Sequence, residues 1–282
     1  MVDATWHPRC QATGHSRRQR PTAPRRQPAG SLLATVGGHR RRSAARSAYP
    51  RVIVISTPRL PHLPHIRTFH PRRGRMGDRH RDALERLSPV YGVPVTGELL
   101  DLGVLFGRHA PVVLEIGSGM GEATAEMAAA DPDRNYLAVD VHTPGIANLL
   151  ALTEARGLAN VRVALGDALD LVRHQLAPDS LDAIHVFFPD PWPKARHHKR
   201  RLIQPQHVEL LCSRLVPGGV LHCATDAADY AEAMLATLSA DPELINAHDG
   251  YAPRPDYRPL TRFEQRGVQA GRDVFDLVFR RR

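Results

Sequence analysis

The amino-acid sequence predicts a doubly wound α/β fold whose sheet is mostly parallel and ends in a late antiparallel strand. Short apolar runs alternate with helical patterns from residue 112 to residue 240, which indicates a sheet with helices on both faces. Gly, Pro or Asp directly follows several of these runs and so ends each strand. Residues 274–279 are apolar apart from Asp276, which predicts a late strand.

The expected elements follow in chain order. A short amphipathic helix over 78–88 begins at Asp78 and ends at Pro89, because proline cannot donate a helical hydrogen bond. An apolar segment at 99–106 precedes the core, Pro217-Gly218-Gly219 forms a turn, and the residues after 240 form loops and the late strand. Core strands are expected at 112–116, 136–141, 161–165, 181–188 and 220–224, and core helices at 122–130, 144–156, 168–176, 205–215 and 229–240.

Positive charge is concentrated in the first quarter of the chain. The net charge of the 282 residues is +9, and residues 1–75 carry 16 Arg, no Lys and one acid, Asp3. Residues 1–64 are rich in Arg, Pro, Ser and Ala and bury too little apolar surface to offset chain entropy. We therefore divide the chain into a disordered extension, 1–64, and a folded domain, 65–282.

Three functional interpretations of the extension stay open beside passive disorder. An Arg-rich arm adds affinity for nucleic acid that does not depend on base sequence. An Arg-rich, acid-poor start is also typical of organellar transit peptides. The third interpretation is translated sequence upstream of the true start.

Cysteine use and hydropathy point to a reducing compartment, and we expect the cytoplasm. Cys10, Cys212 and Cys223 show neither metal-ligand spacing nor a disulfide framework, and the last two fall within apolar runs, where buried thiols are expected. No run approaches the ~18 apolar residues of a membrane helix. We expect no metal, and the sequence leaves open whether the protein is a monomer or a homodimer.

The stretch from Phe187 to Arg201 is the most unusual part of the sequence. It follows an apolar strand, contains prolines at 189, 191 and 193 around Asp190 and Trp192, and ends as a dense basic run. Prolines stiffen a loop, and ligands of open α/β sheets bind beyond the carboxyl ends of strands. The basic run suits phosphates, and its candidate phosphate contacts are Arg196, Lys199, Arg200 and Arg201. The alternatives are a rigid structural loop and a solvated cationic stretch.

Acids and glycines follow three consecutive predicted strands. Glu115 precedes Gly117, Gly119 and Gly121, whose spacing is one residue short of the dinucleotide fingerprint and suits a nucleoside better than a pyrophosphate. Asp140 is placed to accept hydrogen bonds from ribose hydroxyls, and Asp167 to reach an adenine amino group. A plain turn and surface acids are the alternatives for each residue alone. Together the residues resemble the S-adenosylmethionine (AdoMet) half of Rossmann-like class I methyltransferases.

Five motifs read together closely resemble the tRNA (guanine-N7)-methyltransferase family of the bacterial single-subunit type. The resemblance covers 65–282 and rests on Leu114 to Gly121, Val139 to His142, Phe187 to Arg201, Ala224-Thr225-Asp226 and Thr261 to Gly267. It implies AdoMet contacts or a catalytic position for Glu115, Gly117, Gly119, Asp140, Asp167 and Asp190. It implies contacts with the guanosine region for Lys194, Asp226, Thr261, Arg262, Phe263 and Glu264. The family commonly has Glu at position 140 and Lys at position 262.

The resemblance implies methyl transfer from AdoMet to N7 of a guanosine in the variable loop of tRNA, with tRNA as the partner. Guanine N7 carries a lone pair and no proton, so the reaction needs no general base. The protein can supply in-line positioning and a negative field, and Asp190 is the candidate catalytic residue for both.

Three rival functions are weighed. An exocyclic-amine methyltransferase favours a Pro-Pro-Tyr type of loop, which Trp192 and the Thr261 to Glu264 motif speak against. A NAD-linked dehydrogenase should show G-x-G-x-x-G spacing. A non-catalytic RNA-binding protein would have lost its cofactor acids, and the acids at 115, 140, 167 and 190 are present.

Overall fold

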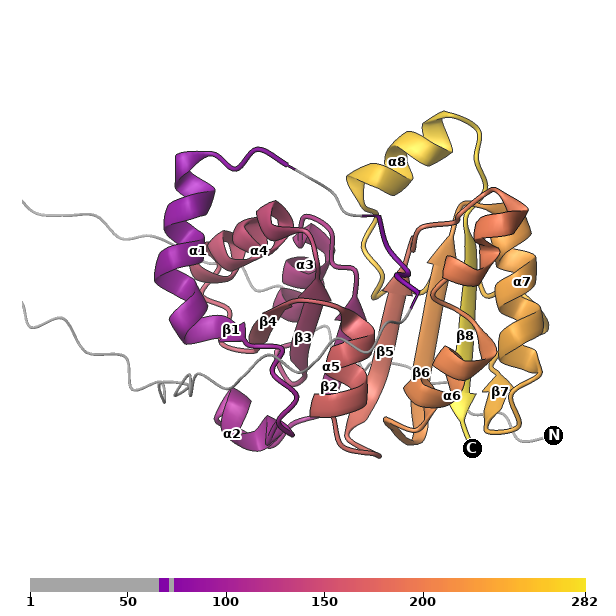
Figure 1. Cartoon of the computed structure of the whole chain (residues 1–282), viewed down its shortest axis with the longest axis horizontal. Helices are drawn as coiled ribbons and strands as arrows, with labels where there is room; N and C mark the ends of the chain where they lie inside the picture. The colour runs from indigo at the N-terminus through magenta and orange to yellow at the C-terminus, as the bar shows by residue number, and fades with distance from the viewer. Residues whose placement is uncertain (1–65, 71–73) are drawn as a thin grey trace, which may run out of the picture. The chain divides into compact units, whose positions relative to one another are not determined.

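An eight-stranded sheet organises the part of the chain that the computed structural model describes, residues 66–70 and 74–282 (Figure 1). The strand order is β1-β4-β3-β2-β5-β6-β8-β7, with β6/β8 and β7/β8 antiparallel and the other pairs parallel. The strands are β1 Gly92–Val93, β2 Val112–Ile116, β3 Asn135–Asp140, β4 Val161–Leu165, β5 Leu181–Phe187, β6 Leu215–Thr225, β7 Leu244–Asn246 and β8 Phe275–Arg281. The predicted fold class, including the late antiparallel strand, is confirmed.

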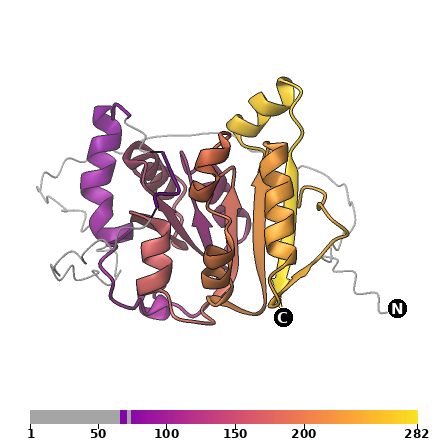
Figure 2. The same ribbon diagram turned by 45° about the vertical axis from the view of Figure 1, so that its right-hand side comes forward.

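Helices cover both faces of this sheet. The helices are α1 Asp78–Tyr91, α2 Leu102–Phe106, α3 Glu122–Ala130, α4 Thr143–Ala155, α5 Ala168–Gln175, α6 Pro205–Cys212, α7 Ala228–Ser239 and α8 Arg262–Gln269, with a 3-10 helix, η1, at Ala195–Arg200. One apolar cluster joins the sheet to α1, α3 and α4, and a second joins its other face to α5, α6 and α7. Figure 2 shows the orange α7 lying along its face of the sheet. Burial of these two clusters holds the sheet between its helical layers.

The direction of the chain across the sheet reverses between β2 and β5. From β2 the chain proceeds outward through β3 and β4, and it then returns to β5 and proceeds the other way through β6. The parallel register pairs Ile116 with Val186, so β2 and β5 end at nearly the same level. In open α/β sheets, ligands bind at such a reversal, beyond the carboxyl ends of the strands.

Two predicted boundaries are wrong. Helix α1 continues through Pro89 to Tyr91, because a proline in the last turn removes only one helical hydrogen bond and the Gly92 N–H still caps the Ser88 carbonyl. The segment Pro217-Gly218-Gly219 lies within β6 as a bulge, since Leu181 pairs with Leu215 while Ala183 pairs with Val220. Burial of Leu215 against the core fixes the start of this strand before the bulge.

Sequence analysis missed three short strands or helices and one full helix. Strand β7 and helix α8 lie where loops were expected after residue 240, η1 lies in the stretch expected as a stiff loop, and β1 lies where no element was assigned. Helix α8 had a readable signal, because Thr261 accepts a hydrogen bond from the Glu264 N–H at 3.1 Å, which is half of a Thr-x-x-Glu capping box. The predicted extension, residues 1–64, lies outside the described residues.

Two smaller findings concern hydropathy and cysteines. Within residues 66–70 and 74–282, no helix combines the length and the apolar character needed to cross a membrane. Cys212 and Cys223 are free, buried thiols, as expected. Burial raises the pKa of the Cys212 thiol to about 11 and raises that of Cys223 further.

Candidate functional site at the carboxyl edge of the sheet

The glycine loop between β2 and α3 is pressed against the first turn of α4. The Gly117 N–H donates to the Val139 carbonyl at 2.8 Å, which joins the loop to β3. Gly119 has a φ of +58°, in the left-handed region that glycine favours. A Cβ added at Gly145 would lie 1.7 Å from the Gly119 oxygen. The backbone of this loop can therefore approach both α4 and a ligand more closely than any other residue type allows.

The carboxylate of Asp140 ties this loop to the end of β3. Its Oδ2 accepts from the Gly119 N–H at 2.8 Å, and its Oδ1 accepts from the His142 N–H at 2.7 Å. A carboxylate oxygen can accept a second hydrogen bond, so the group keeps capacity for hydroxyl donors. In the described part of the chain, the buried Ser118 Oγ and His142 Nδ1 have no hydrogen-bond partner. Buried polar atoms of this kind beside a glycine loop fit a hydroxyl-bearing ligand such as a ribose.

Glu115 lies inside the protein, on β2 directly before the loop. Its side chain is buried, and Oε2 accepts a hydrogen bond from the Thr124 hydroxyl on α3. Burial raises the pKa of Glu115 to about 7, the Thr124 bond opposes that rise, and the charge of Asp140 adds to it. Through this bond Glu115 joins β2 to α3. Its predicted contact with AdoMet stays a prediction.

Asp167 serves as the N-cap of α5. Its Oδ1 accepts from the Leu169 N–H at 2.9 Å, which satisfies one of the free donors at a helix start. The Gly166 N–H donates to the Asp140 carbonyl at 3.1 Å, so this turn lies beside the end of β3. Asp167 therefore lies at the same edge of the sheet as Asp140. Its contact with the adenine amino group stays a prediction.

The loop after β5 carries Asp190 and Trp192 in a strained backbone. Phe188 and Trp192 have φ values of +51° and +47°, which side chains other than glycine rarely adopt and which cluster at functional sites. Asp190 Oδ2 accepts from the His70 backbone N–H at 2.7 Å, and the Trp192 Nε1–H donates to the Thr68 carbonyl at 3.1 Å. The Asp190 side chain is 17% exposed. The contacts with Thr68 and His70 therefore fix the loop beyond the carboxyl end of β5 and leave its carboxylate mostly buried.

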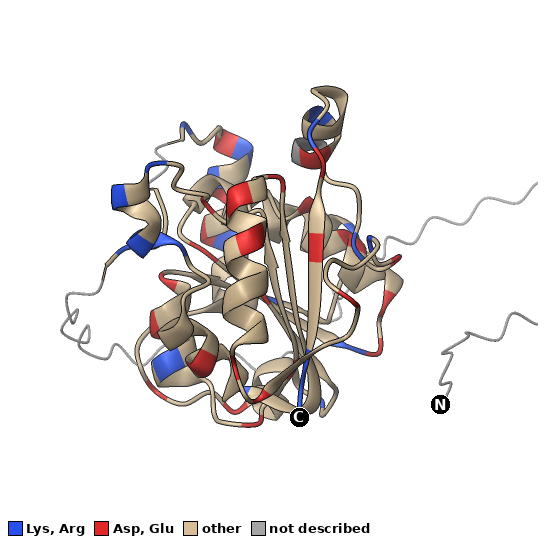
Figure 3. Ribbon diagram, turned by 90° about the vertical axis from the view of Figure 1, so that its right-hand side faces the viewer, with Lys and Arg blue, Asp and Glu red and all other residues tan. Residues whose placement is uncertain are grey.

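The basic run divides into an exposed part and a buried part. Lys194, Arg196 and Lys199 are exposed on or beside η1. The Arg200 guanidinium lies 4.9 Å from the centre of the Trp192 ring. Figure 3 marks the Lys and Arg positions of the described chain in blue and the Asp and Glu positions in red. The Arg201 side chain is only 3% exposed, pairs with Asp229 and donates to the Pro191 carbonyl at 2.9 Å.

Burial corrects the expectation that Arg201 grips a phosphate. The guanidinium stacks 4.6 Å from the Tyr230 ring centre as well as pairing with Asp229, so its charge is satisfied within the protein. It fixes the end of the basic run to α7, whereas Arg196 and Lys199 remain open to a polyanion.

A buried ion network holds the Thr261 to Glu264 motif. Arg258 donates to both Glu264 oxygens at 2.7 and 2.9 Å and to both Asp276 oxygens at 2.7 and 2.8 Å. Arg258 and Glu264 are nearly fully buried, so Glu264 positions α8 through Arg258. Thr261 caps α8. The side chains of Arg262 and Phe263 lie outside the described part of the structure, and their predicted substrate contacts stay predictions.

Asp226 follows β6 at the same edge of the sheet. Its Oδ2 lies 3.2 Å from Arg272 Nε, and the side chain is 15% exposed. The ion pair joins the end of β6 to the segment between α8 and β8. A contact of Asp226 with the guanosine region stays a prediction.

Two buried histidines beside this network were missed by sequence analysis. His185 on β5 pairs in register with Glu115 on β2 and with His222 on β6. His222 Nε2 lies 2.7 Å from Asp276 Oδ1, and its Nδ1 lies 2.9 Å from the Tyr257 hydroxyl. Burial lowers the pKa of both histidines, so they are neutral near pH 7. The available signal was a polar residue within each of two apolar strands.

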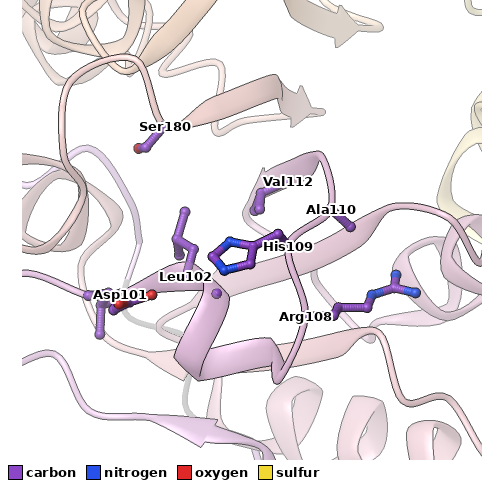
Figure 4. Close-up of a pocket in the computed structure, with 9 residues that line it drawn as sticks. Asp101, Leu102, Arg108, His109, Ala110, Val112 and Ser180 are labelled. Atoms are coloured by element: carbon purple, nitrogen blue, oxygen red, sulfur yellow. The ribbon is translucent and has the colours of Figure 1, made fainter.

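The predicted site residues gather at one edge of the sheet. Glu115, Gly117, Gly119, Asp140, Asp167, Asp190, Asp226 and the start of α8 all lie at or beyond the carboxyl ends of the parallel strands, the upper edge in Figure 1. A hollow of about 360 Å³ at the opposite edge is lined by Asp101, Arg108, His109, Ser180 and neighbours (Figure 4). Within the described residues, no group of three or more His, Cys, Asp or Glu side chains could hold a metal ion.

Comparison with known proteins supports the same reading of the fold and the motifs. The model of a family described as "Putative methyltransferase" matches residues 109–277. A tRNA (guanine-N(7)-)-methyltransferase of Nitrosospira multiformis is 57% identical over 222 residues, covering 79% of this chain and 96% of that protein. One of Streptomyces avermitilis is 59% identical over 218 residues, covering 77% and 75%. The solved 16S rRNA methyltransferase KamB has a TM-score of 0.51 at 19% identity, covering 65% and 94%, and shows the fold.

Glu115 should make stability depend on pH. The Glu115 carboxyl group has an ordinary pKa of 4.5, and its pKa in the folded protein is about 7. Between these pH values it is protonated in the folded state and ionised in the unfolded state, so the folded state loses stability as pH rises through that window. Relative to Glu115→Gln, which stays neutral, the wild type should lose on the order of 3 kcal/mol of unfolding free energy between pH 4.5 and pH 7. Urea unfolding of both proteins at several pH values measures the difference, and parallel stability curves would contradict the assignment.

Proposed function

The chain belongs to the tRNA (guanine-N(7)-)-methyltransferase family, and we propose that it transfers the methyl group of S-adenosyl-L-methionine to N7 of a guanosine in the variable loop of tRNA. It is a methyltransferase, and methylation of guanine N7 in tRNA follows from its relatives. The observation that carries the choice of methyl donor and site is the placement of Asp140, the glycine loop and Asp190 around one strand reversal.

The residues present fit AdoMet. Asp140 would accept from the ribose hydroxyls, since each oxygen holds only one of the backbone N–H groups of Gly119 and His142. The unpartnered Ser118 Oγ and His142 Nδ1 add polar atoms on the same wall. AdoMet supplies an electrophilic methyl group on its sulfonium. The shorter Asp at position 140 retains its carboxylate at the strand end, where the family commonly has Glu.

Asp190 is the proposed catalytic residue. Guanine presents its N1–H and N2–H donors on one edge, and a carboxylate can accept from both. Attack by the N7 lone pair on a methyl group that AdoMet would supply would break the bond of that methyl group to sulfur and place positive charge on the purine, with no proton to release. A fixed carboxylate near that charge favours the transition state. The backbone of this loop, strained at Phe188 and Trp192, holds Asp190 in place for that purpose.

The tRNA would lie over the basic run and α8. Lys194, Arg196 and Lys199 are exposed beside the Asp190 loop, and phosphate contacts of this kind position an RNA without reading its sequence. Asp226 and Thr261 border the same edge from β6 and α8. Glu264 acts through Arg258 and holds α8 rather than touching the base.

A methylation assay tests the proposal directly. The full chain is incubated with methyl-labelled AdoMet and unmodified tRNA, and the product is then treated with borohydride and aniline, which cut at N7-methylguanosine. We expect label transfer and one cut in the variable loop. Transfer with a cut elsewhere would contradict the variable loop, and transfer without a cut would contradict N7 as the acceptor atom.

Asp190→Ala should separate turnover from tRNA binding. The substitution removes the carboxylate that stabilises the cationic purine, so kcat should fall roughly 100-fold or more, while the tRNA dissociation constant changes by less than about 3-fold because phosphate contacts remain. Asp133→Ala, at an exposed acid before β3, is the control and should match the wild type. Single-turnover kinetics and filter binding give the two quantities, and equal losses in both would reject this role.

Arg196→Ala combined with Lys199→Ala should show the reverse pattern. Both side chains are exposed, so the change removes phosphate contacts without leaving a buried charge. The slope of log Kd against log salt should flatten by about 0.7–0.9 per lost contact, with kcat preserved at saturating tRNA. The matched control removes Arg156 and Arg282, two exposed arginines at the ends of α4 and β8. A slope that equals the control would place the tRNA elsewhere.

A further inference from the structure

Residues 66–70 lie across the Asp190 loop, although more than a hundred positions separate them in sequence. The Thr68 carbonyl accepts from the Trp192 Nε1–H at 3.1 Å, and Thr68 is buried. The next anchor is His70, whose backbone N–H donates to Asp190 Oδ2 at 2.7 Å. The segment is thus attached at both the indole and the carboxylate of the loop that carries the proposed chemistry.

The ring of His70 makes the contacts that a purine base would need. Its centroid lies 3.7 Å from that of the Trp192 ring at an interplanar angle of 18°, the geometry of a stacked base. Its Nδ1 lies 3.1 Å from Asp190 Oδ2 and donates when the proton is on Nδ1. The His70 ring therefore stacks on the Trp192 indole, and the backbone N–H and the Nδ1–H of His70 both face Asp190 Oδ2. Guanine offers the same combination of a flat ring and two neighbouring N–H donors.

Exposure indicates that this cover can be removed. The His70 side chain is 55% exposed, whereas Trp192 beneath it is 3% exposed. A half-exposed imidazole is no part of the core, and its departure would expose an aromatic face without opening either apolar cluster.

A hollow beside the ring fits the backbone of an RNA strand. It measures about 410 Å³ and is lined by Ile66, Arg67, Phe69, Lys199 and Arg200. Three cations and one aromatic ring in one hollow suit a phosphate with a neighbouring base. A strand that places its guanine on Trp192 would have this hollow next to it.

We propose that the Trp192 face and the Asp190 carboxylate form the guanine-binding site, and that His70 fills it in the free protein as a stand-in for the base. This inference rests on the proposed function and adds to it a binding face and an internal competitor. Guanine binds only after His70 leaves, so the apparent affinity is reduced by the fraction of molecules whose site is filled.

Fluorescence of Trp192 tests the competition without any methyl transfer. The chain has two tryptophans, Trp6 and Trp192, so the full chain with Trp6→Phe reports on Trp192 alone. Guanosine 5′-monophosphate should quench this signal, and His70→Ala should tighten its binding on the order of 5-fold. His109→Ala, at an exposed histidine of the opposite edge (Figure 4), should leave the affinity unchanged. Adenosine 5′-monophosphate lacks the N1–H donor and should bind more weakly to every variant.

Kinetics with unmodified tRNA separate the competitor from a positioning residue. His70→Ala should lower KM for tRNA with kcat unchanged or raised. His70→Phe, which keeps a stacked ring, should retain a KM near that of the wild type. A fall in kcat at unchanged KM would overturn the proposal and make His70 a residue that positions Asp190. Equal nucleotide affinities of His70→Ala and His109→Ala would also overturn the proposal. If guanosine monophosphate competes with His70 but tRNA receives no methyl group, the proposed function fails and the binding site stands.

Discussion

The reversal of chain direction between β2 and β5 is the constraint on which the rest of the site depends. Because both strands end at one level, the glycine loop and the Asp190 loop leave the sheet side by side. Asp140 then fixes the first loop through two backbone N–H groups, and Thr68 and His70 hold the second. Prolines restrict the φ angles of the Asp190 loop but do not fix where it lies, and the glycine loop is flexible by composition, so both loops owe their positions to the sheet and to these few polar contacts.

A second constraint is the buried charge beneath α8. Arg258 bridges Glu264 and Asp276 with four hydrogen bonds, and Asp276 in turn meets His222. Burial of such groups costs solvation, and loss of one partner leaves an uncompensated charge worth about 3–5 kcal/mol. The network therefore contributes more to specifying where α8 sits than to net stability. It links the Thr261 motif to the last strand, and hence to the sheet edge where Asp190 lies.

The sequence predicted the parts of this structure that local patterns determine. Strand and helix periods placed the core, and acids such as Asp140 at strand ends could be assigned to the ligand edge because parallel strands end together. The partners of long polar side chains could not be predicted. Arg201 reads as one more cation in a basic run, and its burial depends on Asp229 and Tyr230. Glu264 was predicted to contact the guanosine region, and only the fold shows that Arg258 pairs with it and joins it to Asp276.

The pairing of Asp190 suggests how such a site can choose its base. The Asp190 carboxylate is largely shielded from water, and a buried carboxylate with too few hydrogen bonds is costly. The ligand must therefore replace the N–H donors that are lost when His70 departs. Guanine replaces both donors, whereas adenine presents an acceptor at N1 and leaves the carboxylate underpaired. A site built to accept hydrogen bonds rejects an analogue without donors far more strongly than an apolar pocket rejects a change of shape. His70 thus satisfies the hydrogen-bonding capacity of Asp190 before the substrate arrives. A base binds well only if it offers Asp190 hydrogen bonds as good as those of His70.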